Sequence, residues 1–68
     1  MEFVDLLLDN GEFVRIECPD KYYDELYESI DDAMKRGDFW STTQFEGCSA
    51  TYLGIILDRI NMKRVVGM

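Results

Sequence analysis

A chain of 68 residues is long enough for one small domain, so we expect a single domain over residues 1–68. The apolar fraction of 47% excludes a disordered chain, and a net charge of −7 opposes direct binding to nucleic-acid phosphates. No apolar run approaches the roughly 18 residues of a membrane-spanning helix, so a membrane partner is not expected.

The acidic residues are concentrated in the first half of the chain. Residues 1–32 contain eleven carboxylates and two cations, whereas residues 33–68 contain three carboxylates and five cations. Net charge governs association and solubility more than it governs fold. The asymmetry therefore predicts a charged partner rather than a particular chemistry.

Two apolar runs flank Asn10-Gly11, a strong signal for a β-hairpin. The inward-facing candidates of both runs all occupy even positions: Val4, Leu6, Leu8, Val14, Ile16 and Cys18. A two-residue turn would pair even with odd positions and split this core set between the two faces of the sheet. We therefore expect a three-residue loop that ends at a left-handed Gly11. This register places Asp5 opposite Arg15.

Residues 19–37 carry the clearest helix pattern. Pro19 suits the first helical position, where its missing N–H costs nothing, and Gly37 suits the left-handed residue after the last turn. Apolar residues recur at three- and four-residue spacing and predict one buried stripe, made of Tyr22, Tyr23, Leu26, Tyr27, Ile30, Ala33 and Met34. The opposite face carries the acids Asp24, Glu25, Glu28, Asp31 and Asp32.

The second half of the chain has the composition of strands. Residues 39–45 are rich in β-branched and aromatic side chains and predict a third strand, and residues 49–56 predict a fourth after a turn at 46–48. The remaining stretch combines helical spacing with strand-forming valines and isoleucines. We expect a tight turn near Asp58 and then a short last strand around 62–66, with a C-terminal helix as the alternative.

This order of elements predicts an α+β fold: a small antiparallel sheet (ββαββ, with a fifth strand expected at the C-terminal end) and one amphipathic helix packed on one face. The other face of the sheet would carry Phe3, Leu7 and Phe13. Trp40 or Phe39 would join them, depending on the orientation of the third strand, and we take Trp40. Exposed apolar faces of this kind mark interfaces, so we predict a homo-oligomer built on this face.

Cys18 and Cys48 are the only cysteines, and they stand thirty residues apart without a CxxC motif or a secretory segment at the N-terminus. We expect two reduced thiols in a cytoplasmic protein, with a Cys18–Cys48 disulfide as the alternative. A zinc site is not expected, because two cysteines without histidine leave half of a tetrahedral site to carboxylates.

No motif in the chain supports catalysis. Neither cysteine has a histidine to activate it, because the chain contains none. Glu28, Asp31 and Asp32 share a helix face but lack the loop and central glycine of a calcium site. We therefore expect no enzymatic activity, no cofactor and no metal.

Arg59, Lys63 and Arg64 form a small basic cluster with Asn61 near the C-terminal end. A direct phosphate binder normally has a basic domain, so we interpret these cations as a counterweight to the acidic half. The tyrosines and Trp40 are interpreted as core or interface aromatics rather than as base-stacking groups.

The predicted function is that of a small acidic, non-catalytic binding or regulatory protein. Its acidic helix face would engage a protein partner with a basic surface and compete for a site that phosphates normally fill. By analogy of charge and length, this suggests an inhibitor of a nucleic-acid-handling or defence protein, of phage or mobile-element type. The alternatives are a homo-oligomeric structural or regulatory domain, and a small-ligand-binding subunit whose interface pocket is lined by Tyr22, Tyr27 and Trp40.

Overall fold

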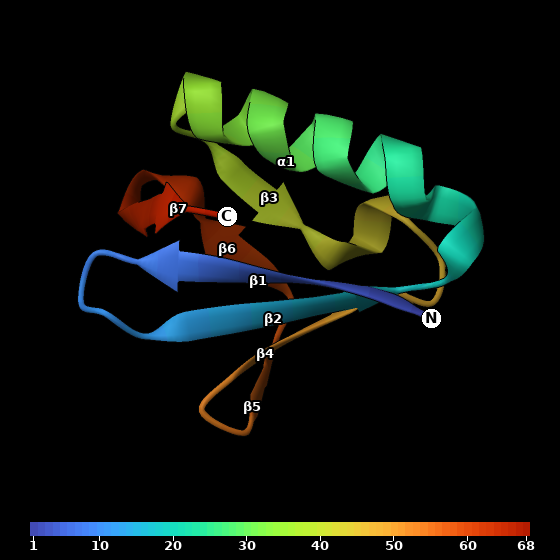
Figure 1. The fold of residues 1–68 in the computed structure, drawn as a ribbon, viewed down its shortest axis with the longest axis horizontal. Coiled ribbons are helices and arrows are strands. Elements are labelled where there is room, and N and C mark those ends of the chain that lie inside the picture. Colours follow the sequence, from blue (N-terminus) through green and yellow to red (C-terminus); the bar gives the residue numbers. More distant parts are fainter.

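The computed structural model describes all residues from 1 to 68 and contains one long helix and seven strands (Figure 1). The elements are β1 (Glu2–Leu8), β2 (Phe13–Cys18), α1 (Tyr23–Arg36), β3 (Phe39–Ser41), β4 (Ser49–Tyr52), β5 (Ile55–Leu57), β6 (Arg59–Asn61) and β7 (Val65–Gly67). Three 3-10 turns join them: η1 (Asp20–Tyr22), η2 (Thr42–Gln44) and η3 (Met62–Arg64).

Five strands form an antiparallel sheet in the order β5-β4-β2-β1-β7, and the other two form a separate β3-β6 pair. The single helix packs against this arrangement through one shared hydrophobic core. The predicted α+β class is therefore confirmed.

The β1–β2 hairpin has the predicted register. Asp5 lies opposite Arg15, and all six even-numbered apolar residues of the two strands are buried. The N–H of Leu8 donates to the carbonyl oxygen of Glu12 over 2.8 Å and closes a three-residue loop. Gly11 ends that loop with a φ of +83°, a left-handed conformation that favours glycine.

The core lies between the inner face of the sheet and α1. Figure 1 shows α1 running across one side of β1 and β2, with β3 between them. On the helix, Leu26, Ile30 and Ala33 are buried in one cluster with the inward-facing strand residues. Tyr27 is half-buried beside them, whereas Tyr23 is exposed. The predicted stripe is thus confirmed in its centre but is shorter at its start, because η1 precedes α1.

The outer face of the hairpin carries an ion pair among apolar residues. Arg15 donates from Nε to Oδ1 of Asp5 over 2.8 Å and from Nη2 to Oδ2 over 3.0 Å. These hydrogen bonds from Arg15 hold the pKa of the Asp5 carboxyl below its usual value. The same guanidinium lies 4.3 Å from the ring centroid of Phe3. The outer face is therefore amphipathic rather than uniformly apolar.

Trp40 is a core residue, and its predicted place in an oligomer interface is wrong. β3 does not join the large sheet but pairs with β6, with Trp40 opposite Ile60. The Trp40 side chain is 1% exposed and donates from Nε1 to Oγ of Ser29 on α1 over 2.9 Å. The neighbouring Phe39 is 57% exposed, because successive side chains of a strand point to opposite faces.

The predicted third strand ends four residues early. β3 stops at Ser41, whose Oγ accepts a hydrogen bond from the N–H of Thr43 over 3.3 Å at the start of η2. The carbonyl oxygen of Asp58 accepts from the N–H of Thr42 over 3.0 Å and from its hydroxyl over 3.2 Å. These bonds satisfy the backbone outside a β-ladder, so the strand-forming composition of 42–45 does not produce a strand.

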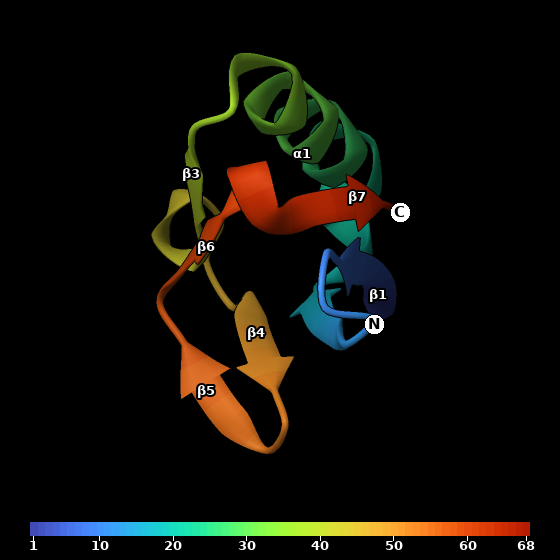
Figure 2. The same ribbon diagram turned by 90° about the vertical axis from the view of Figure 1, so that its left-hand side faces the viewer.

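The predicted strand over 49–56 is instead a hairpin. Tyr52 lies opposite Ile55, so Leu53 and Gly54 form a two-residue turn between β4 and β5. Their φ angles are +49° and +78°, the positive values that a type I′ turn requires. Leucine rarely adopts a positive φ, so a leucine at position 53 does not indicate a turn in the sequence. The hairpin projects away from α1 (Figure 2).

The tight turn expected near Asp58 is a bend between β5 and β6. The last strand begins at Val65 rather than at Met62, because η3 precedes it. β7 pairs with β1, with Leu7 opposite Gly67, and forms one edge of the large sheet. The C-terminal end is therefore extended, and the alternative of a C-terminal helix is excluded.

Cys18 and Cys48 form a disulfide, so the expectation of two free thiols is wrong. β2 pairs with β4, and Glu17 lies opposite Ser49. Continuing this register by one residue brings Cys18 beside Cys48, with their Cα atoms 4.2 Å apart. The intervening residues, 19–47, contain α1 and β3, and only the strand order of the sheet brings the two cysteines together.

Candidate functional site

The five acids predicted to bind a partner all lie on the exposed side of α1. The burial of Leu26, Ile30 and Ala33 fixes the orientation of the helix, because these side chains face the core. Gly37 ends the helix with a φ of +66°, and its N–H bonds to the carbonyls of the last turn. The exposed acids are Asp24, Glu25, Glu28, Asp31 and Asp32.

The charge of this face is not uniform along the helix. Lys35 pairs with Asp31 over 2.9 Å, and Arg36 pairs with Asp32 over 3.0 Å. The hydrogen bond and the charge of Asp31 raise the pKa of Lys35. The three remaining acids of the helix, Asp24, Glu25 and Glu28, have no cation within ion-pair distance. The uncompensated negative charge is therefore concentrated in the first two turns of α1.

A shallow hollow of about 520 Å³, widely open to solvent, lies beside this face. Its lining consists of Glu25, Glu28, Ser29, Asp31, Asp32 and Phe45. Phe45 follows η2 and is half-buried, with its ring centroid 5.2 Å from that of Tyr22 and 6.4 Å from that of Trp40. Two hydrogen bonds fix the Ser29 hydroxyl: it donates to the carbonyl oxygen of Leu26 and accepts from Nε1 of Trp40.

This combination of groups suits a long cationic side chain. Carboxylates bind an ammonium or guanidinium through charge-assisted hydrogen bonds. An aromatic ring can pack against the apolar stem or stack with a guanidinium plane. The hollow offers both, because Phe45 is its single apolar residue among four carboxylates.

The hollow brings together four of the five predicted acids and leaves out Asp24. Sequence reasoning missed Ser29 and Phe45. Phe45 is far from the helix in sequence, and its segment predicts a strand. The carboxylates do not converge on one point: no three acidic or cysteine side chains are placed to hold a metal ion. The only helix longer than one turn, α1, lacks the length and apolar character needed to cross a membrane.

The predicted interface residues separate into two groups. Phe3 and Phe13 are 54% and 57% exposed on the outer face of the hairpin, where half-buried Leu7 lies opposite Phe13 and the Asp5–Arg15 pair separates these two from Phe3. Trp40, in contrast, is buried. The alternative ligand pocket is not formed within one chain, because neither Tyr22 nor Tyr27 lines any of the three cavities.

Comparison with known protein families, curated proteins and solved structures found no match to this chain. Functional proposals for this fold therefore rest on its own residues and their geometry.

Proposed function

We propose that this protein is a non-catalytic binding protein that engages a macromolecular partner through the exposed face of α1. The observation that carries the proposal is the hollow that Glu25 and Glu28, both free of ion pairs, line together with Phe45. A partner with a basic surface would insert a lysine or arginine side chain there. This binding of a basic surface by carboxylates suits an inhibitor of a nucleic-acid-handling or defence protein, of phage or mobile-element type.

The mode of action is competition for a phosphate-binding surface. Closely spaced carboxylates on a rigid helix present negative charge to a basic site and exclude nucleic acid from it. Such charges act mainly on the rate of association. Their effect decreases with added salt, because exposed charges are screened over about 8 Å at physiological ionic strength.

The proposal predicts that reversing two unpaired acids in the hollow strongly weakens binding. In the double variant Glu25→Lys and Glu28→Lys, the hollow would repel a cationic side chain. Association with an arginine- and lysine-rich probe peptide, and with any basic protein captured from a lysate, should slow at least about tenfold at low salt. Surface plasmon resonance at two salt concentrations measures this effect, after circular dichroism has confirmed an intact helix.

A matched control has the same change in net charge elsewhere. Glu12→Lys combined with Asp58→Lys reverses two acids that make no ion pair and do not line the hollow. This control should retain most of the binding. Equal binding by the two folded double variants would refute a localised site on α1, since only net charge would then matter.

A second candidate function is assembly into a homo-oligomer through the outer face of the sheet. The specific observation is the exposure of Phe3 and Phe13, at 54% and 57%, beside Leu7. Leu7→Lys should dissociate the assembly, because burying a lysine in the interface without an opposite charge is unfavourable. Sedimentation at micromolar concentration measures this, with Leu53→Lys as a matched leucine replacement at an exposed turn. A purely monomeric wild-type protein would remove this candidate.

The cytoplasmic location expected from the sequence belongs to this proposal, which places the partner in the same compartment. The Cys18–Cys48 disulfide counts against it, since disulfides persist mainly in oxidising compartments. Cell fractionation combined with rapid thiol trapping tests the point. A trapped disulfide in the soluble cytoplasmic fraction supports both the location and the bond.

A further inference from the structure

A second concave site lies apart from α1, on the side of the core that the helix does not cover. It is a cavity of about 310 Å³. No residue of α1 and no carboxylate contributes to its lining, although the chain contains fourteen acids. The lining residues come from several strands and from η3: Leu8, Val14, Phe39, Tyr52, Leu57, Arg59, Ile60, Asn61 and Arg64.

The floor of this cavity is apolar and its rim is aromatic. Leu8, Val14 and Ile60 are buried members of the hydrophobic core. Phe39 is exposed at the rim, and the guanidinium of Arg59 lies 5.2 Å from its ring centroid. A flat apolar group can therefore pack on core residues and on an aromatic ring at the same time.

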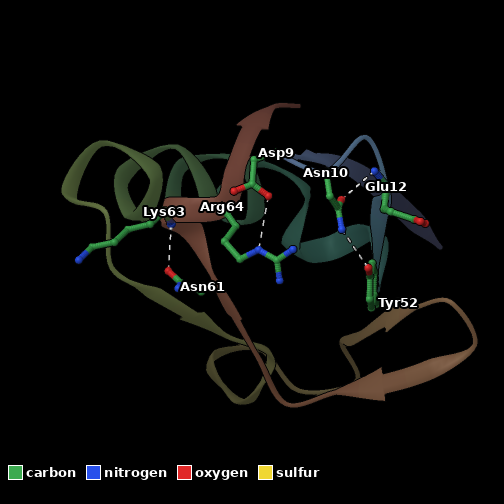
Figure 3. A network of polar contacts seen from close by, with 7 residues as sticks. All are labelled: Asp9, Asn10, Glu12, Tyr52, Asn61, Lys63 and Arg64. Carbon is green, nitrogen blue, oxygen red and sulfur yellow. Dashed lines mark hydrogen bonds and ion pairs between the residues drawn. The ribbon is translucent and has the colours of Figure 1, made fainter.

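The polar side chains of the cavity retain unused hydrogen-bond donors. The Tyr52 hydroxyl accepts from Nδ2 of Asn10 over 3.3 Å, which leaves its own O–H free (Figure 3). Oδ1 of Asn61 accepts from the N–H of Lys63 over 3.1 Å, so the Asn61 amide NH₂ remains free.

The two arginines of the cavity add ten guanidinium N–H groups, five from each side chain, as expected from arginine chemistry. Arg59 makes no ion pair or side-chain hydrogen bond. Arg64 forms one ion pair, with its Nε 3.5 Å from Oδ1 of Asp9, and both side chains are about half exposed (Figure 3). The unpaired guanidinium of Arg59 and the donors that Arg64 does not direct to Asp9 are the complement of an anion.

We infer that this cavity binds a free nucleoside phosphate. The base would lie against Phe39 and the apolar floor, and the phosphate would accept hydrogen bonds from Arg59 and Arg64. Asn61 and Tyr52 would donate to ring or sugar oxygens and nitrogens. The volume agrees with this class of ligand, since small-molecule sites begin at about 300 Å³. This ligand site is independent of the proposed function of α1.

A free nucleotide fits better than a nucleotide within a strand. The loop beside the cavity carries Asp9, which pairs with the lining residue Arg64 (Figure 3), and Glu12 follows it in the chain. The phosphates that flank a bound nucleotide in a strand would meet this loop and a protein of net charge −7. Electrostatic repulsion would therefore oppose the binding of a nucleic-acid strand, whereas a single phosphate could still bind to the two arginines.

The experiment is a titration of the whole protein with adenosine monophosphate, followed by the backbone amide resonances. We expect saturable shifts at β3, β6 and η3, with little change along α1. Adenosine alone and inorganic phosphate alone should each bind at least about tenfold more weakly, because each makes only half of the contacts. Shifts that do not saturate, or that spread over the exposed lysines, would overturn the inference.

Two pairs of variants separate the site from general effects. Arg59→Ala should weaken binding at least about tenfold, because a hydrogen bond to a charged group is lost. Its control is Lys21→Ala, which also removes one cation that lies over an aromatic ring, at 5.1 Å from Tyr22, but outside the cavity. Equal affinities for the two variants would contradict a role for Arg59.

The second pair tests the stacking of the base. Phe39→Leu should weaken binding at least about fivefold, since aromatic stacking is lost. Phe13→Leu is the control, because Phe13 is an equally exposed strand phenylalanine on the outer face of the large sheet, outside the cavity. An oligoadenylate that binds more than tenfold tighter than the mononucleotide would overturn the free-nucleotide assignment and indicate a single-stranded nucleic acid instead.

Discussion

Reduction of the Cys18–Cys48 disulfide should lower the free energy of unfolding by about 3.6 kcal/mol. The bond joins residues thirty positions apart, and cross-linking a loop of that length removes a corresponding chain entropy from the unfolded state. A domain of this size has a total stability of roughly 3–10 kcal/mol. The disulfide therefore accounts for a large fraction of the stability, which a small core cannot supply alone.

Thermal unfolding with and without dithiothreitol measures this effect. The midpoint should fall by roughly 15 °C or more on reduction. The double variant Cys18→Ala and Cys48→Ala is the control, because its midpoint should be low and insensitive to the reductant. If thiol titration shows two free thiols after treatment but the midpoint is unchanged, the bond does not support the fold.

Replacing Trp40 by alanine should destabilise the protein by about 4 kcal/mol. The indole is 1% exposed, and its removal leaves a cavity between α1 and β3. The substitution also removes the indole N–H that donates a hydrogen bond to the Ser29 hydroxyl in the folded protein. The loss is a large part of the roughly 3–10 kcal/mol expected for a domain of this size, so we expect a strongly lowered unfolding midpoint.

Urea unfolding followed by circular dichroism tests this expectation. Trp40→Phe keeps most of the ring volume but loses the hydrogen bond, so it should cost about half as much as Trp40→Ala. In the wild-type protein, the fluorescence of this single tryptophan should shift to longer wavelength as the core opens. A stable Trp40→Ala variant would show that Trp40 does not anchor the helix.

The sequence leaves the Cys18–Cys48 disulfide open as an alternative and does not reveal the two concave sites, for the same reason. Each depends on which strands are neighbours. Cys48 meets Cys18 only because β4 adds to β2, and Phe45 reaches α1 only because β3 leaves the large sheet. The sequence favours a charge-balancing role for Arg59 and Arg64, because it does not place Phe39 beside them.

The sequence by itself determined the features that depend on local periodicity. The even-numbered apolar positions dictated the hairpin register with Asp5 opposite Arg15, because a shift by one residue would expose the core set. The three- and four-residue spacing around Leu26 and Ile30 determined which face of α1 is acidic and exposed.

Only the tertiary structure decided the partners of the later strands and the direction of Trp40. Strand order depends on long-range packing, and a short apolar strand such as β3 fits several neighbours equally well until the core closes.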